Sequence, residues 1–116
     1  MSELRPVKLL IAAMGGEGGG VLMDWIVNAC WRLDYPVQAT SVPGVAQRTG
    51  ATTYYIEILP ERRKPDDKRP IFALTPTSGE VDLMVATELA EAARAVSMGF
   101  VTTDRTTLIA ATHRVY

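Results

Sequence analysis

The arrangement of apolar and polar residues at the start of the chain predicts a strand, a glycine-rich turn and a helix. Residues 7–13 are apolar except for Lys8, which is typical of a strand covered on both faces in a parallel sheet. Glycine occupies five of positions 14–20, and apolar residues then recur with the helical period. We expect this stripe to face the core, with Cys30 as inert packing; it comprises Val21, Leu22, Trp25, Ile26, Ala29, Cys30 and Leu33.

The glycine-rich turn has the chemistry of an anion site. Glycine lets a ligand approach the backbone, and the first turn of a helix offers unpaired N–H groups and a positive dipole end. The turn departs from standard motifs, because Val21 replaces the third glycine of G-x-G-x-x-G and a P-loop lysine is lacking. Glu17 would repel a phosphate if its side chain pointed inward. Two interpretations stay open: an anion or cofactor site, and a tight turn without a ligand.

The remaining pattern predicts an α/β fold, a Rossmann-like open and mostly parallel sheet with helices on both faces. Further strands are expected at residues 37–42, 52–59, 71–75, 81–86 and 107–112. A second helix is expected from Thr87, as its N-cap, to about Met98, with Gly99 ending it.

A second segment, S-V-P-G-V-A-Q-R-T-G from Ser41 to Gly50, is expected to line the same site as the glycine-rich turn. It follows a strand that should run parallel to the first, so both loops should lie beyond the carboxyl ends of the strands, where open α/β sheets bind ligands. Arg48 offers a planar fork of donors that suits phosphate or carboxylate. The alternative is a surface arginine that pairs with Glu17 or with a partner, and position slightly favours the ligand-binding role.

No set of residues in the sequence predicts catalysis. Three roles stay open for Glu17: a catalytic base, a partner of Arg48, or a side chain in solvent. The catalytic role is the least favoured of the three. His113 is the only histidine and is interpreted as structural. Glu88 directly follows a strand end and could face the cleft, but electrostatics at a helix start explains it sufficiently. Trp31 falls off the main stripe and is expected to mark a contact surface. The chain therefore reads as a binding or assembly domain that serves chemistry located elsewhere.

Composition excludes several classes of protein. The chain has 116 residues, 47% hydrophobic and 22% charged, which fits one globular domain. A net charge of −1 gives no indication of nucleic acid or membrane partners. A single cysteine excludes an internal disulfide and an all-cysteine metal site, and a cytoplasmic location is expected. Residues 60–70 are dense in charge and proline, and we favour a solvated loop over a basic docking patch.

Three motifs together resemble the gamma-type domain of 2-oxoacid:ferredoxin oxidoreductases. They are A-M-G-G-E-G-G-G-V-L, then S-V-P-G-V-A-Q-R-T-G-A-T-T-Y-Y-I-E, then V-D-L-M-V-A-T-E. Within that family the second motif looks closest to the beta subunit of the indolepyruvate branch. Two departures are Glu17, where the family usually has Gln, and Thr49, where a glycine is common. The resemblance covers essentially the whole chain, and we expect residues 1–116 to be one domain, the N-terminal portion of a longer subunit.

The resemblance implies a reaction and partners. An aryl 2-oxoacid, coenzyme A and oxidised ferredoxin would give an acyl-CoA, carbon dioxide and reduced ferredoxin. Thiamine diphosphate and iron–sulfur clusters would reside on a larger alpha subunit, and this chain would help to hold coenzyme A. The site residues implied by the two glycine motifs are Gly15, Gly16, Glu17, Gly18, Gly44, Gln47, Arg48 and Gly50.

Two kinds of alternative remain beside the indolepyruvate assignment. The first keeps the family and changes the substrate to pyruvate, 2-oxoglutarate or a branched-chain 2-oxoacid. The second is a stand-alone nucleotide- or CoA-binding module, or an assembly domain without catalytic consequence.

Overall fold

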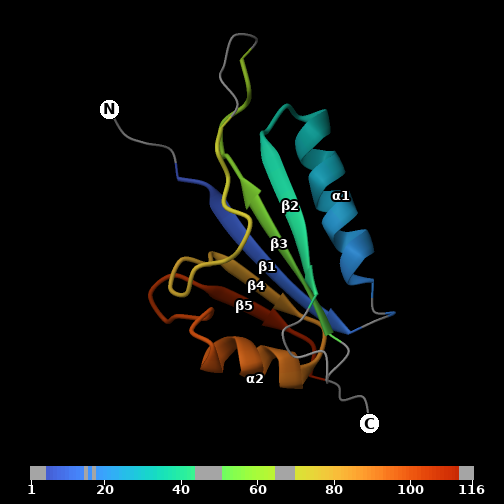
Figure 1. Ribbon diagram of the computed structural model, residues 1–116, viewed down its shortest axis with the longest axis vertical. Coiled ribbons are helices and arrows are strands. Elements are labelled where there is room, and N and C mark those ends of the chain that lie inside the picture. Colours follow the sequence, from blue (N-terminus) through green and yellow to red (C-terminus); the bar gives the residue numbers. More distant parts are fainter. Residues whose placement is uncertain (1–4, 15, 17, 44–50, 65–69, 113–116) are drawn as a thin grey trace.

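The chain folds around a five-stranded mixed sheet flanked by two helices (Figure 1). The computed structural model describes residues 5–14, 16, 18–43, 51–64 and 70–112. In chain order the elements are β1 (Val7–Met14), α1 (Gly19–Arg32), β2 (Val37–Pro43), β3 (Ala51–Ile58), β4 (Leu83–Ala86), α2 (Leu89–Ser97) and β5 (Thr107–Ala110). The strand order is β2-β3-β1-β4-β5. β3 is antiparallel to both β1 and β2, while β4 is parallel to β1 and to β5, so only β3 opposes the others.

The two helices cover opposite faces of this sheet, as the sequence predicts. Successive side chains of β1 alternate between the faces, as the period of a strand requires. Leu9, Ile11 and Ala13 belong to the core cluster that includes α1 residues, whereas Leu10 and Ala12 belong to the cluster with α2. The predicted α/β class, with a mostly parallel sheet and helices on both faces, is therefore confirmed.

The prediction that Trp25 lies in the core is wrong. Trp25 is 68% exposed, and Val21 and Leu33 at the ends of the predicted stripe are also exposed. The buried face of α1 is instead centred between Met23 and Cys30, so Trp25 points away from the sheet. Apolar residues surround much of this helix, and periodicity alone therefore did not identify the face that packs.

The predicted strand at residues 71–75 is absent from the structure, which shows an irregular segment there. This segment crosses the sheet face, as Figure 1 shows, and its backbone bonds to side chains of β2 and β3. The Ala73 N–H donates to Glu57 Oε1 at 3.0 Å, and the Thr40 hydroxyl donates to the Leu74 carbonyl at 2.8 Å. These bonds satisfy backbone groups that a strand edge would otherwise pair.

The start of α2 also differs from the prediction. Glu88, not Thr87, is the N-cap residue, and its side chain makes no capping bond. The Thr87 hydroxyl instead accepts a hydrogen bond from the Met14 N–H at 3.3 Å. At the other end, Gly99 follows the helix with a φ of 80°, which confirms its predicted role as the residue that ends it.

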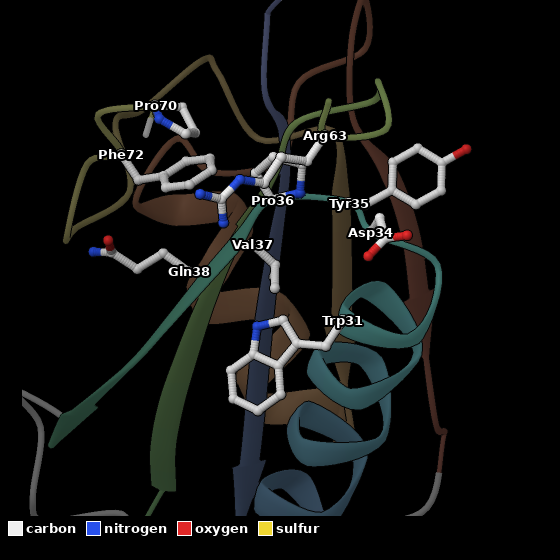
Figure 2. Close-up of a pocket in the computed structure, with 9 residues that line it drawn as sticks. All are labelled: Trp31, Asp34, Tyr35, Pro36, Val37, Gln38, Arg63, Pro70 and Phe72. Carbon is white, nitrogen blue, oxygen red and sulfur yellow. The ribbon is translucent and has the colours of Figure 1, made fainter. Parts of the chain in front are cut away.

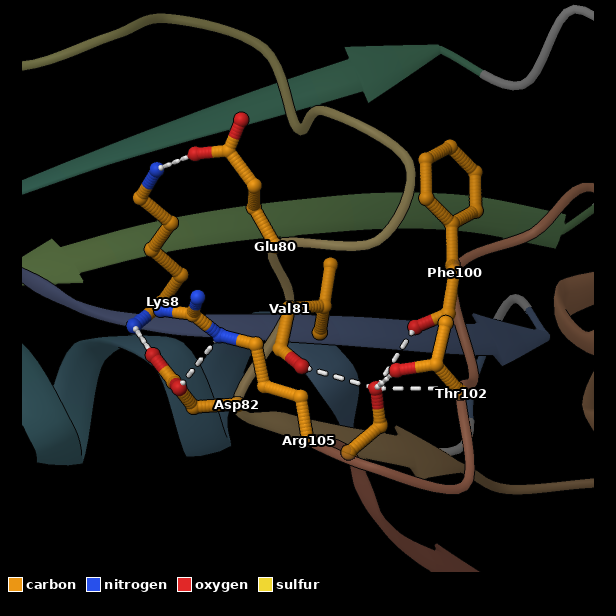
Figure 3. Close-up of polar contacts among 8 residues, drawn as sticks. Lys8, Glu80, Val81, Asp82, Phe100, Thr102 and Arg105 are labelled. Atoms are coloured by element: carbon orange, nitrogen blue, oxygen red, sulfur yellow. Dashed lines mark hydrogen bonds and ion pairs between the residues drawn. The ribbon is translucent and has the colours of Figure 1, made fainter.

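Two ion pairs lie at the end of the sheet where β1 and β4 begin (Figure 3). Asp82 accepts hydrogen bonds from the Lys8 backbone N–H at 2.8 Å and from Arg105 Nε at 3.0 Å. The Lys8 ammonium pairs with Glu80 Oε1 at 2.6 Å. The two acidic residues thus tie β1 to the segment before β4 and to the turn before β5.

Candidate functional site

The carboxyl ends of β1 and β4 form a topological switch point. The two strands are parallel neighbours, yet the chain turns from β1 to α1 on one face and from β4 to α2 on the other. The loops that follow such strands diverge and leave a crevice, which is where open α/β sheets bind ligands. The Thr87 N–H donates to the Ala12 carbonyl at 3.0 Å, so the end of β4 lies directly beside the end of β1.

Two glycines with left-handed backbone conformation connect β1 to α1. Gly16 has a φ of 83° and Gly18 a φ of 82°, a region that residues with a side chain rarely adopt. An added Cβ at either position would have no atom of the described residues within 4 Å. The sequence therefore specifies glycine here for the backbone conformation, and the described residues do not crowd the turn.

The first residue of α1, Gly19, is a glycine because Ala13 and Tyr54 lie against it. A Cβ on Gly19 would come within 2.6 Å of Ala13 Cβ and 2.8 Å of Tyr54 Cε2. Sequence reasoning did not single out Tyr54, although the two adjacent tyrosines of β3 must face opposite sides of the sheet. This ring fixes the position of the helix start relative to the sheet.

The N-terminus of α1 is suited to an anion. Gly18 is its N-cap and supplies no side chain, and the first turn contains no acidic residue. The early N–H groups therefore have no side-chain cap, and the helix dipole adds to their attraction for negative charge.

Glu88 is a buried carboxylate at the same edge of the sheet. The residue is 8% exposed, and its Oε2 has no hydrogen-bond partner in the described part of the chain. Glu91, one turn further along α2, is 5% exposed, and its nearest cation is Arg94 at 3.8 Å. Burying an unpaired carboxylate is unfavourable, and electrostatics at the helix start, the interpretation favoured from the sequence, does not account for this burial.

Of the eight predicted site residues, the structure describes Gly16 and Gly18. Both lie at the predicted edge, and their backbone conformation is that of an open turn. The other six are outside the described residues, as is His113: Gly15, Glu17, Gly44, Gln47, Arg48 and Gly50. The strand ends that bracket residues 44–50 are described, and Ala51 pairs with Met14 while Pro43 pairs with Thr52. The second segment therefore leaves and re-enters the sheet at the edge where β1 ends.

The remaining candidates give no catalytic or metal chemistry among the described residues. Burial raises the pKa of the Cys30 thiol, which disfavours the reactive thiolate and fits its predicted packing role. No cluster of three or more His, Cys, Asp or Glu side chains capable of holding a metal occurs in the described ranges. Within the same ranges, neither helix has the length and apolar character that a membrane crossing requires.

Fold and sequence together define an open α/β domain with a glycine turn at the switch point of its sheet. A model of the family described as pyruvate ferredoxin/flavodoxin oxidoreductase matches residues 8–115, nearly the whole chain. The chain therefore belongs to the pyruvate ferredoxin/flavodoxin oxidoreductase family. No curated protein sequence matches it.

The fold is similar to part of a solved oxidoreductase. That structure is a 2-oxoglutarate:ferredoxin oxidoreductase from Magnetococcus marinus with 2-oxoglutarate, coenzyme A and succinyl-CoA bound. The TM-score is 0.62 at 17% sequence identity, and the match covers 95% of this chain. The chain spans 20% of the length of that protein.

Proposed function

We propose that this chain is the non-thiamine component of a 2-oxoacid:ferredoxin oxidoreductase, with an arylpyruvate such as indolepyruvate as the oxidised substrate. The observation that carries the proposal is the family match over residues 8–115, which includes the open glycine turn at the switch point. The coenzyme A and succinyl-CoA bound by the structurally similar oxidoreductase support an acyl-CoA product. The choice of arylpyruvate rests on the second glycine motif, S-V-P-G-V-A-Q-R-T-G.

In this proposal the chain binds and orients coenzyme A, and it excludes water from one side of the reacting centre. The N–H groups at the start of α1, reached past Gly16 and Gly18, would hold a phosphate of coenzyme A. Arg48 and Gln47 would add donors from the second segment to a phosphate or to the substrate carboxylate. Glu88 would accept a hydrogen bond from an N–H or O–H group of the bound molecule, which would satisfy its unpaired oxygen.

The redox and decarboxylation chemistry belongs to a partner in this proposal. The residues of this chain do not fit an iron–sulfur cluster, because the sequence has one cysteine and that thiol is buried. Thiamine diphosphate and the clusters would therefore reside on an alpha subunit, which would pass electrons to ferredoxin. This chain alone would be inactive.

The decisive experiment is anaerobic dye reduction by the chain with and without its candidate alpha subunit. Indolepyruvate and coenzyme A would be supplied together and singly, followed by pyruvate, 2-oxoglutarate and a branched-chain 2-oxoacid. We expect reduction only with both proteins and both substrates, and fastest with indolepyruvate. Faster reduction with another 2-oxoacid would change the substrate and keep the family role.

Two results would count against the catalytic assignment. Dye reduction by the partner alone, unchanged when this chain is added, would remove the chain from the reaction. Tight binding of a nucleotide or coenzyme A by the isolated chain, without any partner effect, would then favour a stand-alone binding module.

A further inference from the structure

The start of β2 and the end of α1 enclose a hollow of about 440 Å³ at the opposite edge of the sheet from the glycine turn (Figure 2). Its volume lies within the ~300–1,000 Å³ typical of small-molecule sites. The 14 residues of α1 span about 21 Å, so the hollow and the glycine turn lie at opposite ends of this helix. The hollow is therefore a separate place on the molecule from the proposed coenzyme A site.

Aromatic rings form the walls of this hollow. Trp31 comes from the last turn of α1, Tyr35 and Pro36 from the turn before β2, and Phe72 from the segment that crosses the sheet. Trp31 is 64% exposed, although burying its indole would be strongly favourable. The largely exposed indole of Trp31 offers a stacking surface for a planar molecule.

Arg63 places a positive charge in the hollow, and backbone hydrogen bonds fix the position of this residue. The Arg63 N–H donates to the Asp34 carbonyl at 2.6 Å, and the Leu59 N–H donates to the Pro36 carbonyl at 2.9 Å. Its guanidinium forms no ion pair or hydrogen bond with the described residues, and in Figure 2 it reaches toward Phe72 and Gln38. The neighbouring Arg62 has a different position, 5.9 Å above the ring of Tyr35.

The distribution of charge around the hollow restricts what it can bind. Asp34 also lines the hollow, but Figure 2 places its carboxylate beside Tyr35, away from the Arg63 guanidinium. An acidic group would therefore be favoured on the side of Arg63 and Gln38, where a guanidinium fork and an amide can both donate. Trp31 lines the same hollow, so its indole is available to a ring attached to that acidic group.

We propose that this hollow binds a small planar aromatic molecule that carries one acidic group, held by Arg63 and stacked on Trp31. A carboxylate and a phosphate would meet the same donors, so the shared chemistry is an aromatic ring joined to an anion. The site is independent of the coenzyme A crevice, and its failure would leave the proposed function unaffected.

Trp31 provides its own reporter for the test. The sequence contains two tryptophans, and Trp25 does not line the hollow, so Trp25→Phe leaves Trp31 as the only tryptophan of the full chain. The probes are AMP and phenylacetate, which combine a ring with an anion, and adenosine, inorganic phosphate and acetate, which carry one part each. We expect saturable quenching of Trp31 fluorescence by AMP, phenylacetate or both, with each partial probe at least about tenfold weaker.

Matched variants distinguish probe binding in this hollow from binding elsewhere on the chain. In the Trp25→Phe chain, Arg63→Ala should weaken the bound probe at least about tenfold, whereas Arg62→Ala should leave its affinity unchanged. Trp31→Leu, followed by calorimetry, should also weaken binding while circular dichroism shows an intact fold, because the indole is largely exposed. Binding of AMP alone identifies a phosphate ligand, and binding of phenylacetate alone identifies a carboxylate.

Three outcomes would overturn the proposal. They are the absence of saturable binding by either complete probe, equal affinities for AMP and adenosine without binding of phenylacetate, and equal effects of Arg63→Ala and Arg62→Ala. AMP binding that survives Arg63→Ala and is lost in Gly18→Ala would place the nucleotide at the glycine turn instead.

Discussion

The ring of Tyr54 lies against Gly19 so closely that a methyl group on Gly19 would come within 2.8 Å of Tyr54 Cε2. We expect Gly19→Ala to lower the free energy of unfolding by about 1–3 kcal/mol, because the added methyl group would clash with Ala13 of β1 and Tyr54 of β3 and force the start of α1 away from the sheet. Urea unfolding measures this loss. If the proposed function holds, the Michaelis constant for coenzyme A in the complex with the alpha subunit should also rise, because the helix start moves.

Gly20→Ala is the matched control for this substitution. A Cβ on Gly20 would meet the Tyr54 hydroxyl at 3.4 Å, which is close to an ordinary contact. Because alanine favours helix over glycine, this variant should be neutral or more stable by up to about 1 kcal/mol. Equal losses at both positions would contradict the special role of the contact between Gly19 and Tyr54.

Backbone conformation, and not space, should limit substitution at Gly18. A side chain there would meet no described atom, but the φ of 82° costs an ordinary L-residue about 1–2 kcal/mol. Gly18→Ala should therefore lower stability by about that amount, and Gly18→Asn should lower it less, because asparagine adopts this conformation more readily. Thermal unfolding of both variants provides the measurement, and a larger loss for Asn would indicate a steric cause.

The buried pair of Tyr55 and Glu57 anchors the segment that crosses the sheet. The Tyr55 hydroxyl donates to Glu57 Oε2, and Glu57 Oε1 accepts the Ala73 N–H at 3.0 Å. Burial and this hydrogen bond raise the pKa of Tyr55 well above its usual range, so the hydroxyl remains a donor at neutral pH.

Tyr55→Phe should lower the free energy of unfolding by about 1–3 kcal/mol, because it leaves a carboxylate oxygen of Glu57 buried without a partner. Faster hydrogen exchange at the Ala73 N–H should accompany the loss. Tyr54→Phe is the control, since the Tyr54 hydroxyl makes no hydrogen bond in the described part of the chain, and its effect should stay within about 0.5 kcal/mol. Similar losses for the two tyrosines would contradict the anchoring role.

The pair of Lys8 and Glu80 should make stability depend on pH in the acid range. The hydrogen bond from Lys8 lowers the pKa of Glu80 below its ordinary value of 4.5. A carboxyl group whose pKa is lower in the folded state stabilises the protein above its unfolded pKa, and this contribution is lost as the pH falls through the folded pKa. Glu80→Gln should therefore differ most from the natural chain at neutral pH and converge with it in acid. A difference that grows on acidification would contradict this assignment.

Much of the fold follows from local patterns, and the errors have identifiable physical causes. The glycine-rich turn, the strands and Gly99 were predictable because positive φ and apolar runs are local properties. The buried face of α1 was not predictable, because Trp25, Val21 and Leu33 fit the same helical period as the buried residues. The segment at residues 71–75 is apolar like a strand, but its backbone bonds to Glu57 and Thr40, which only the tertiary structure brings near.

The edge at which β1 and β2 end was predictable, whereas residues 15, 17 and 44–50 of the predicted site lie outside the described residues. Parallel strands place their carboxyl ends together, so the glycine turn and the second segment could be expected to meet. The burial of Glu88 could not, because it depends on how α2 packs against the sheet. The side chain of Glu88 looks like an ordinary helix-start acid in sequence, whereas the structure gives it an unpaired oxygen.

That unpaired oxygen allows a structural role of Glu88 to be distinguished from a functional one. A residue that serves the fold destabilises it when replaced, whereas a residue held in an unfavourable state for binding can stabilise the free protein when its charge is removed. We expect Glu88→Gln to keep or raise the free energy of unfolding, by up to about 2 kcal/mol, and to weaken coenzyme A binding in the complex with the alpha subunit. Urea unfolding of the chain and the Michaelis constant for coenzyme A give the two measurements. Glu61→Gln, a change at an exposed loop residue, is the control and should alter neither. A large loss of stability for Glu88→Gln, with the Michaelis constant unchanged, would assign the carboxylate to the fold and remove it from the site.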